Sequence, residues 1–210
     1  MKRFWSFFLV SLALGVAPGP DILFVLAQAL ASGWQAGAFV TLGLCSGLVF
    51  HVSLAAFGIA AVLSHYPRVF KAITWVGAAY LVYLGVLTWQ EASVVQVDSS
   101  GAVETLSSGR LYLRGVIMNI LNPKVMLFFL ALVPRFIVPT RGAVAGQFVV
   151  LGLIFAVSTL LVFTTVSVLG GSLSAWLAET PNAMLSLRYF SALVMFGIAA
   201  WIGWMNSRNG

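Results

Sequence analysis

Long apolar runs separated by short polar connections extend along the whole chain. A helix that crosses a lipid bilayer needs about 20 apolar residues, and six segments reach that length. They cover residues 4–31, 38–63, 70–90, 111–137, 143–170 and 184–205. The ten-residue alternation typical of a transmembrane β-barrel does not occur in the sequence. The pattern predicts an all-α integral membrane protein with six transmembrane helices.

One connection differs from the others in length and composition. Residues 91–110 are polar and rich in Ser and Gly, which is typical of a mobile segment. This loop divides a single transmembrane domain, 1–210, into two groups of three spans, 1–90 and 111–210. A group with three crossings ends on the opposite side from its start, so two similar groups form an inverted repeat, as in many transporters.

Composition supports the membrane assignment and excludes several classes of function. Hydrophobic residues make up 61% of the chain and charged residues 8%, whereas soluble domains are about half apolar and a quarter charged. The net charge of +6 comes from residues that flank apolar runs, so it does not indicate nucleic-acid binding. The one cysteine, Cys45, excludes an intrachain disulfide or thiolate cluster. We expect no metal and no cofactor.

The basic residues also predict an orientation. Seven Lys and Arg fall on the side that carries both termini and three on the other, so both termini are expected in the cytoplasm. Lys2 and Arg3 followed by an apolar run also resemble a signal peptide. Because the apolar run resumes directly after Asp21, we expect a retained first span.

Spans one and four each contain a proline motif near the middle. The motifs are "APGPD" and "LNPK", and Pro20 and Pro123 are 103 residues apart, the same offset as Gly43 and Gly146. Each span is nearly 30 residues long, and a straight helix of that length would exceed the bilayer core of about 30 Å. We therefore predict two helices broken at equivalent places in two repeats. Chance resemblance between two proline-kinked helices is the alternative.

Proline has no N–H, so each motif leaves backbone carbonyls without their usual helical partner. The freed carbonyls are those of Leu14 (through Pro18), Val16 (through Pro20) and Asn119 (through Pro123). In lipid such groups need partners from protein, water or ligand. Gly19 and Asn122 occupy N-cap positions before the prolines. Each break thus presents the amino terminus of a half-helix, which carries partial positive charge.

The charges that follow the two prolines are not equivalent. Asp21 is favourable at a helix amino terminus, where it either caps the helix or binds a ligand. Lys124 adds positive charge to a positive end, and a buried charge costs about 2.5–3.5 kcal/mol on membrane-insertion scales. It lies too far from either end of its span to reach the interface easily, although snorkelling is the alternative. We expect Lys124 to face inward, near an anion.

His51 is the third candidate polar residue. Gly43, Gly47 and His51 recur every four residues and share one face of span two. The Gly-x-x-x-Gly spacing favours close approach of another helix, which would turn His51 inward. A hydrogen-bonded structural histidine and a proton-carrying histidine fit this pattern equally well.

Four stretches together resemble a known family. They are "PGPDILFVL", "GLCSGLVFH", "WVGAAYLVYLG" at 75–85 and "NILNPKVMLFFLALVPRF" at 119–136. In this order and spacing they are similar to the LysE/RhtB family of bacterial amino-acid exporters. The resemblance implies a multi-pass exporter in the bacterial inner membrane, driven by the proton gradient and dimeric. The family motifs map onto Pro18, Gly19, Pro20, Asp21, Asn119, Asn122, Pro123 and Lys124. Many relatives have Asn where this chain has Asp21.

These residues suggest how a zwitterionic amino acid would bind. Lys124 and the half-helix amino termini would hold its carboxylate, and Asp21, Asn119 and freed carbonyls of span one would hold its ammonium. In the empty protein Asp21 and Lys124 would pair with each other, and a proton on Asp21 or His51 would shift the competition with substrate. No second acidic residue lies within a span, which favours a neutral or small polar amino acid, such as homoserine, threonine or leucine, over lysine or arginine. A channel, a structural subunit and a membrane enzyme using Asp21 and His51 remain as alternatives.

Overall fold

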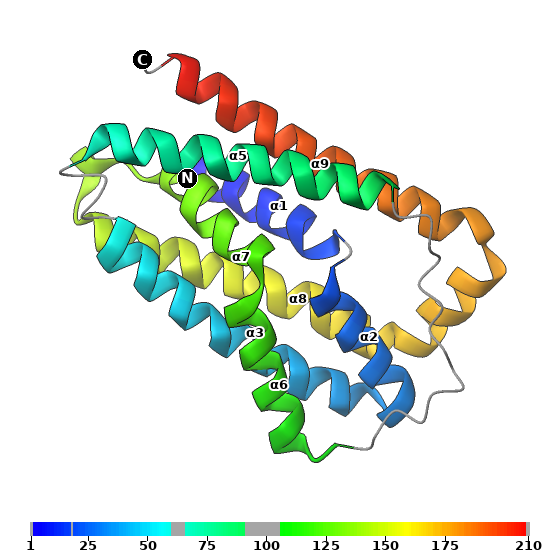
Figure 1. The fold of residues 1–210 in the computed structure, drawn as a ribbon. Helices are drawn as coiled ribbons and strands as arrows, with labels where there is room; N and C mark the ends of the chain where they lie inside the picture. The colour runs from blue at the N-terminus through cyan, green and yellow to red at the C-terminus, as the bar shows by residue number, and fades with distance from the viewer. Residues whose placement is uncertain (1, 18, 60–65, 91–105, 209–210) are drawn as a thin grey trace.

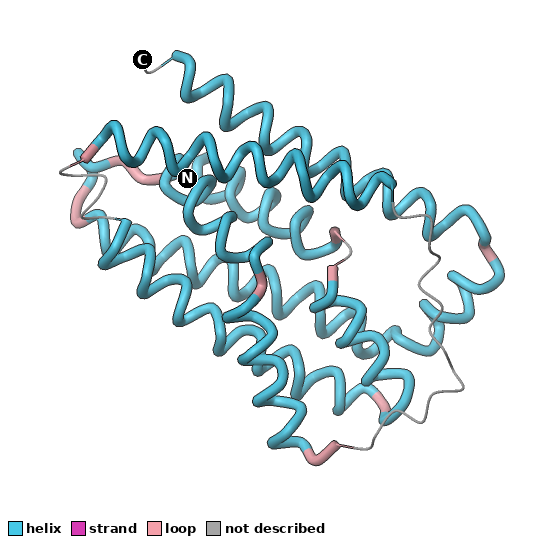
Figure 2. The backbone as a smooth tube through the Cα atoms, viewed as in Figure 1, coloured by secondary structure: helices cyan, strands magenta, loops and turns pink. Residues whose placement is uncertain are grey.

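The computed structural model describes residues 2–17, 19–59, 66–90 and 106–208. Within these ranges the chain is helical and contains no strand (Figure 2). The elements of the first half are α1 (Lys2–Val16), α2 (Pro20–Ser32), α3 (Trp34–Ser53), the π-helix η1 (Leu54–Ile59) and α5 (Pro67–Gln90). Those of the second half are α6 (Ser108–Leu121), α7 (Pro123–Leu127), the π-helix η2 (Phe128–Leu132), the 3₁₀ turns η3 (Val133–Phe136) and η4 (Pro139–Arg141), α8 (Val144–Glu179) and α9 (Pro181–Arg208).

The described ranges contain four to six candidate membrane spans. Four single helices are long and apolar enough to cross a membrane, and the number rises to six if each of two bent pairs is one span. The bent pairs are α1 with α2, which meet at 61°, and α6 with the segment Pro123–Phe136, which meet at 48°. Both bends lie at the predicted proline motifs. Most of the predicted loop 91–110 lies outside the described residues, and α6 begins within it, at Ser108.

The outer faces of the bundle are apolar. Only 28–44% of each single span is buried within the protein, and large apolar side chains such as Phe57 (77% exposed) cover the rest. A contiguous apolar surface of this extent is expected of a protein solvated by lipid. The chain is therefore an all-α integral membrane protein, as its composition predicts.

Two hydrophobic clusters fill the interior, and the helix breaks lie between them. The larger cluster holds Phe7 and Leu14 of α1 together with the segment from Val125 to Ile137. The smaller cluster holds Val25 of α2 and Leu111 of α6. Helices α3 and α8 pass through both clusters and contact each other. The chain thus changes from one cluster to the other at each break. Figure 1 shows the change of direction between α1 and α2 and between α6 and α7.

Polar contacts tie the elements together at the end where α1 begins. The Gln147 side chain accepts hydrogen bonds from Arg3 Nη1 (3.1 Å) and from the backbone N–H of Val138 (3.0 Å), and it donates to the Val138 carbonyl (2.9 Å). Arg135 Nη2 donates to Asn206 Oδ1 at 2.6 Å. These bonds join α1, α8, α9 and the segment after α7 at one end of the molecule.

Candidate functional site

A side chain beside the break between α6 and α7 forms a hydrogen bond to the backbone at the break between α1 and α2. Gly19 has an extended backbone (φ −163°, ψ 173°) as the N-cap of α2, and Pro20 takes the first helical position, as predicted. Helix α1 ends at Val16, so the carbonyl of Ala17 lies beyond its last turn. Lys124 Nζ donates a hydrogen bond to that carbonyl at 2.8 Å. The lysine that follows one proline motif thus satisfies the backbone beside the other.

The second break follows the same rules of capping. Asn122 is the N-cap of α7, its Oδ1 accepts a hydrogen bond from the backbone N–H of Lys124 at 3.0 Å, and Pro123 takes the first helical position. These features confirm the predicted cap. The cap also fixes the backbone of Lys124, so the position of its side chain follows from the geometry of the break.

The carbonyl of Asn119, which Pro123 frees, accepts a hydrogen bond from the backbone N–H of Asn122 at 3.0 Å and has a second partner on α3. His51 Nε2 lies 2.9 Å from this oxygen. Because a carbonyl can only accept, Nε2 carries the proton and Nδ1 presents a lone pair. The His51 ring is 1% exposed and stacks on Phe129, with 6.0 Å between ring centroids. The prediction that His51 faces inward is confirmed.

Asp21 and Lys124 are both buried, at 7% and 6% exposure, and both face the space beside Gly19. A methyl group placed on Gly19 would lie 2.8 Å from Asp21 Oδ1 and 3.6 Å from Lys124 Nζ. The hydrogen bond of Lys124 nevertheless goes to Ala17, and Asp21 Oδ1 has no hydrogen-bond partner within the protein. The expectation that the two charges pair directly in the empty protein is therefore wrong. The freed backbone carbonyl competes for the ammonium.

Buried polar atoms without a partner gather at the two breaks. Among the described residues, six buried side-chain atoms lack one, and four of them belong to predicted site residues. These four are Asp21 Oδ1, His51 Nδ1, Asn119 Oδ1 and Asn122 Nδ2. An unsatisfied buried polar group costs about 1–3 kcal/mol. A cluster of them therefore indicates a place where a ligand supplies the missing partners.

Close contact between α3 and α6 positions Asn119. A methyl group on Gly43 would collide with the carbonyl of Tyr112, and one on Gly47 would lie 2.7 Å from Asn119 Cβ. Gly115 on α6 faces the backbone of α3 in the same way. The predicted close approach at the Gly-x-x-x-Gly face is confirmed. Gly146, in contrast, has nothing within 4 Å, so its shared offset with Gly43 does not reflect a shared role.

Two features of the structure were not predicted from the sequence. The carbonyl that holds Lys124 belongs to Ala17, whereas the freed carbonyls expected in span one were those of Leu14 and Val16. The second is Gln28 on α2, which is 3% exposed and whose Oε1 has no partner. A signal for Gln28 existed, because it is a polar residue inside an apolar span, seven positions after Asp21.

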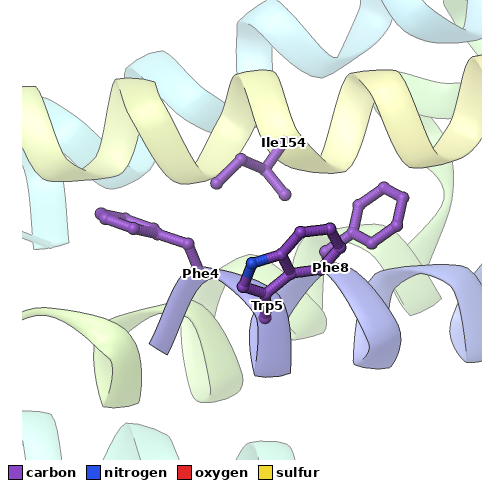
Figure 3. A pocket seen from close by; sticks show the side chains of 4 residues that line it. All are labelled: Phe4, Trp5, Phe8 and Ile154. Carbon is purple, nitrogen blue, oxygen red and sulfur yellow. The ribbon is translucent and has the colours of Figure 1, made fainter. Parts of the chain in front are cut away.

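A groove between α1 and α8 is a poor candidate for binding an amino acid. It has a volume of about 310 Å³ and is lined by Phe4, Trp5, Phe8 and Ile154 (Figure 3). Its lining is apolar, and Trp5 is 62% exposed on the outer surface of the bundle. A zwitterion needs charged partners, which this groove does not offer. The breaks remain the candidate site.

Comparison with known proteins identifies the family of the chain. The family model of the LysE type translocator matches residues 12–205. A homoserine/homoserine lactone efflux protein of Salmonella typhi is 31% identical over 192 residues, 91% of each chain. A leucine efflux protein of Salmonella choleraesuis is 26% identical over 149 residues, which are 71% of this chain and 70% of that one. No solved structure matches. The chain therefore belongs to the LysE type translocator family, and it is a transporter rather than an enzyme.

Proposed function

We propose that this protein exports a neutral or small polar amino acid, or a close derivative, from the cytoplasm in exchange for protons. The observation that carries the proposal is the pair of buried opposite charges, Asp21 and Lys124, that face the same space beside Gly19. Relatives named for homoserine, homoserine lactone and leucine efflux support a substrate of this kind.

The atoms at the breaks match the two charged groups of an amino acid. Lys124 Nζ has three N–H donors and gives one to Ala17, so two remain for a carboxylate. Asn122 Nδ2 is a further donor without a partner. Asp21 Oδ1 and Asn119 Oδ1 are acceptors without a partner, which suits an ammonium. Substrate binding would thus satisfy groups that the protein alone leaves unpaired.

The charge count favours a neutral substrate. A zwitterion brings one positive and one negative charge, which Asp21 and Lys124 balance. Lysine or arginine would bring a second positive charge, and the other four acids of the chain lie at 91, 98, 104 and 179, away from the breaks in sequence. Export of a basic amino acid is the alternative within the same family.

Asp21 is the proposed site of proton exchange. A proton on its carboxylate would remove the negative charge that holds the substrate ammonium, so proton entry and substrate release would compete at one group. Lys124 is the charged group that faces Asp21, and His51 lies on α3 at the other break. We assign His51 a positioning role, because its Nε2–H holds the Asn119 carbonyl beside the break. Proton uptake at its free Nδ1 is the alternative, which the His51→Gln variant tests.

The placement in the cell is part of the same proposal. A bacterial inner membrane with both termini in the cytoplasm agrees with the excess of Lys and Arg on the side of the termini. In this orientation α1 runs from the cytoplasm to the break, and α2 runs from the break to the other side. The inverted repeat, which the sequence pattern predicts, and a homodimer, which the family resemblance implies, stay predictions.

A growth and efflux assay tests the proposed function. Cells that lack their own exporters would express the chain and be challenged with a panel of toxic amino acids, their analogues and dipeptides that release them. We expect protection and extracellular accumulation for at least one neutral or hydroxylated amino acid, and loss of both when an uncoupler collapses the proton gradient. Protection against lysine or arginine alone would favour the alternative. Ionic currents without any efflux would indicate a channel and contradict the proposal.

Asp21→Asn should alter the response of export to external pH. The amide keeps the shape of the side chain but carries no charge and cannot take up a proton. Substrate should therefore bind more weakly, and export should lose most of its dependence on the pH gradient. The measurement is efflux from proteoliposomes at several imposed pH gradients. His51→Gln, which keeps an N–H donor for the Asn119 carbonyl, is the matched control and should retain the dependence. An unchanged pH response in Asp21→Asn would exclude Asp21 as the proton carrier.

A further inference from the structure

Gln28 is a buried polar residue that the site at the breaks does not use. It lies on α2 seven residues after Asp21, hence on the same face of the helix and about 10 Å further along its axis. Its side chain is 3% exposed, and Oε1 has no hydrogen-bond partner. Asp21 Oδ1 is in the same condition. One face of α2 therefore carries two hydrogen-bond acceptors without a partner, about two helical turns apart.

Two hydroxyl groups on the helices that pack on α2 do not donate a hydrogen bond to Gln28 Oε1. Helix α2 packs on α3 and α8, where Gly37, Ser167 and Ala29 meet. Ser167 Oγ donates to its own helix at Phe163, 2.8 Å away, and Thr41 Oγ1 donates to Gly37 at 2.8 Å. These hydroxyl protons are committed. Among the described residues, Gln28 Oε1 thus has no donor, and a substrate could supply one.

The residues between Asp21 and Gln28 suggest why a substrate ammonium that moves along α2 would need a hydrogen-bond acceptor at Gln28. Val25, which is 0% exposed, lies between the two polar residues on this face of α2. A substrate ammonium that leaves Asp21 along α2 would meet only apolar surface, where an unsolvated charge is unfavourable. An amide oxygen one step further would lower that barrier. Because it is uncharged, it would hold the ammonium less tightly than a carboxylate and release it again.

We propose that Gln28 is a substrate-contacting residue on the release route, whose Oε1 accepts a hydrogen bond from the substrate ammonium after it leaves Asp21. The inference rests on the proposed function, since it needs an ammonium-bearing substrate and the orientation in which α2 leads outward. Gln28 would thus be a second binding position beyond the one at the breaks. The face of α2 that carries Asp21 and Gln28 would line the outward route of the substrate.

The test compares Gln28→Met with the wild type in proteoliposomes loaded with an amino acid that the wild type exports. Met keeps the length of the side chain and removes the amide. We expect the maximal export rate to fall about 10-fold, the loss of one hydrogen bond to a charged group, while half-saturation on the loading side changes less than twofold. Gln35→Met, at an exposed position next to α2, is the matched control and should export normally.

Gln28→Glu is the second variant and keeps an oxygen in place while adding charge. It should release substrate slowly when the outer solution is neutral and faster when it is acidic, a pattern that a purely structural role would not produce. If Gln28→Met and Gln28→Glu both match the wild-type rate and pH response at equal protein amounts, the inference is overturned. If the wild type exports no amino acid, the proposed function fails instead, so the two failures are distinguishable.

Discussion

Lys124→Ala should reduce export to the background of cells without the transporter. The change removes the one cation at the breaks that can bind the substrate carboxylate and also the donor to the Ala17 carbonyl. The loss of a charge-assisted hydrogen bond of about 3 kcal/mol corresponds to at least about 100-fold in rate. The measurement is initial efflux per transporter molecule, with protein in the membrane quantified in parallel.

Two further variants separate the charge of Lys124 from its structural bond. Lys124→Gln keeps an N–H donor for Ala17 but carries no charge, so it should be folded and still inactive. Lys71→Ala removes an exposed lysine at the start of the third span and should export normally. Full export by Lys124→Ala and Lys124→Gln at wild-type protein levels would contradict the proposed binding site and with it the proposed function.

Gly43→Ala should destabilise the protein more than any other Gly-to-Ala change in α3. The added methyl group would collide with the Tyr112 carbonyl, which belongs to backbone and cannot move aside as a side chain can. Helices α3 and α6 would have to separate, which in an overpacked core costs about 3 kcal/mol. Thermal unfolding in detergent, followed by the loss of monodisperse protein, measures the effect. Export should fall as well, because α6 carries Asn119.

Gly146→Ala is the control for this change, since the same substitution occurs in a helix but meets no atom within 4 Å. Alanine favours a helix by about 1 kcal/mol over glycine, so this variant should be unchanged or slightly more stable. Equal stability of Gly43→Ala and Gly146→Ala would show that the close crossing of α3 and α6 does not exist in the membrane.

Local rules explain why much of this molecule can be predicted from its sequence. The spans follow from apolar length, and the two breaks follow from prolines that cannot continue a helix. Gly19 and Asn122 cap the half-helices because of their positions before those prolines. The face shared by Gly43, Gly47 and His51 follows from helical periodicity alone. Each of these inferences needs only a few consecutive residues.

The parts that escaped prediction depend on which helices meet. The sequence shows that the Asn119 carbonyl needs a partner, but only the packing of α3 on α6 shows that His51 provides it. Likewise, the preference of Lys124 for Ala17 over Asp21 depends on the relative positions of two breaks that are about 100 residues apart in sequence. Gln28 is recognised only once the hydroxyls around α2 are seen to be committed elsewhere. The π-helices η1 and η2 carried no sequence signal that we identified.

The exchange of partners between the breaks has a consequence for how the protein is made. Spans leave the ribosome in order, so Ala17 and His51 enter the membrane before Lys124 and Asn119 have been synthesised. Until the fourth span arrives, the Ala17 carbonyl and the His51 ring lack the bonds they have in the finished protein, a costly state in lipid. The first three spans alone thus leave polar groups unpaired that the complete protein satisfies. Assembly finishes when the two breaks dock against each other.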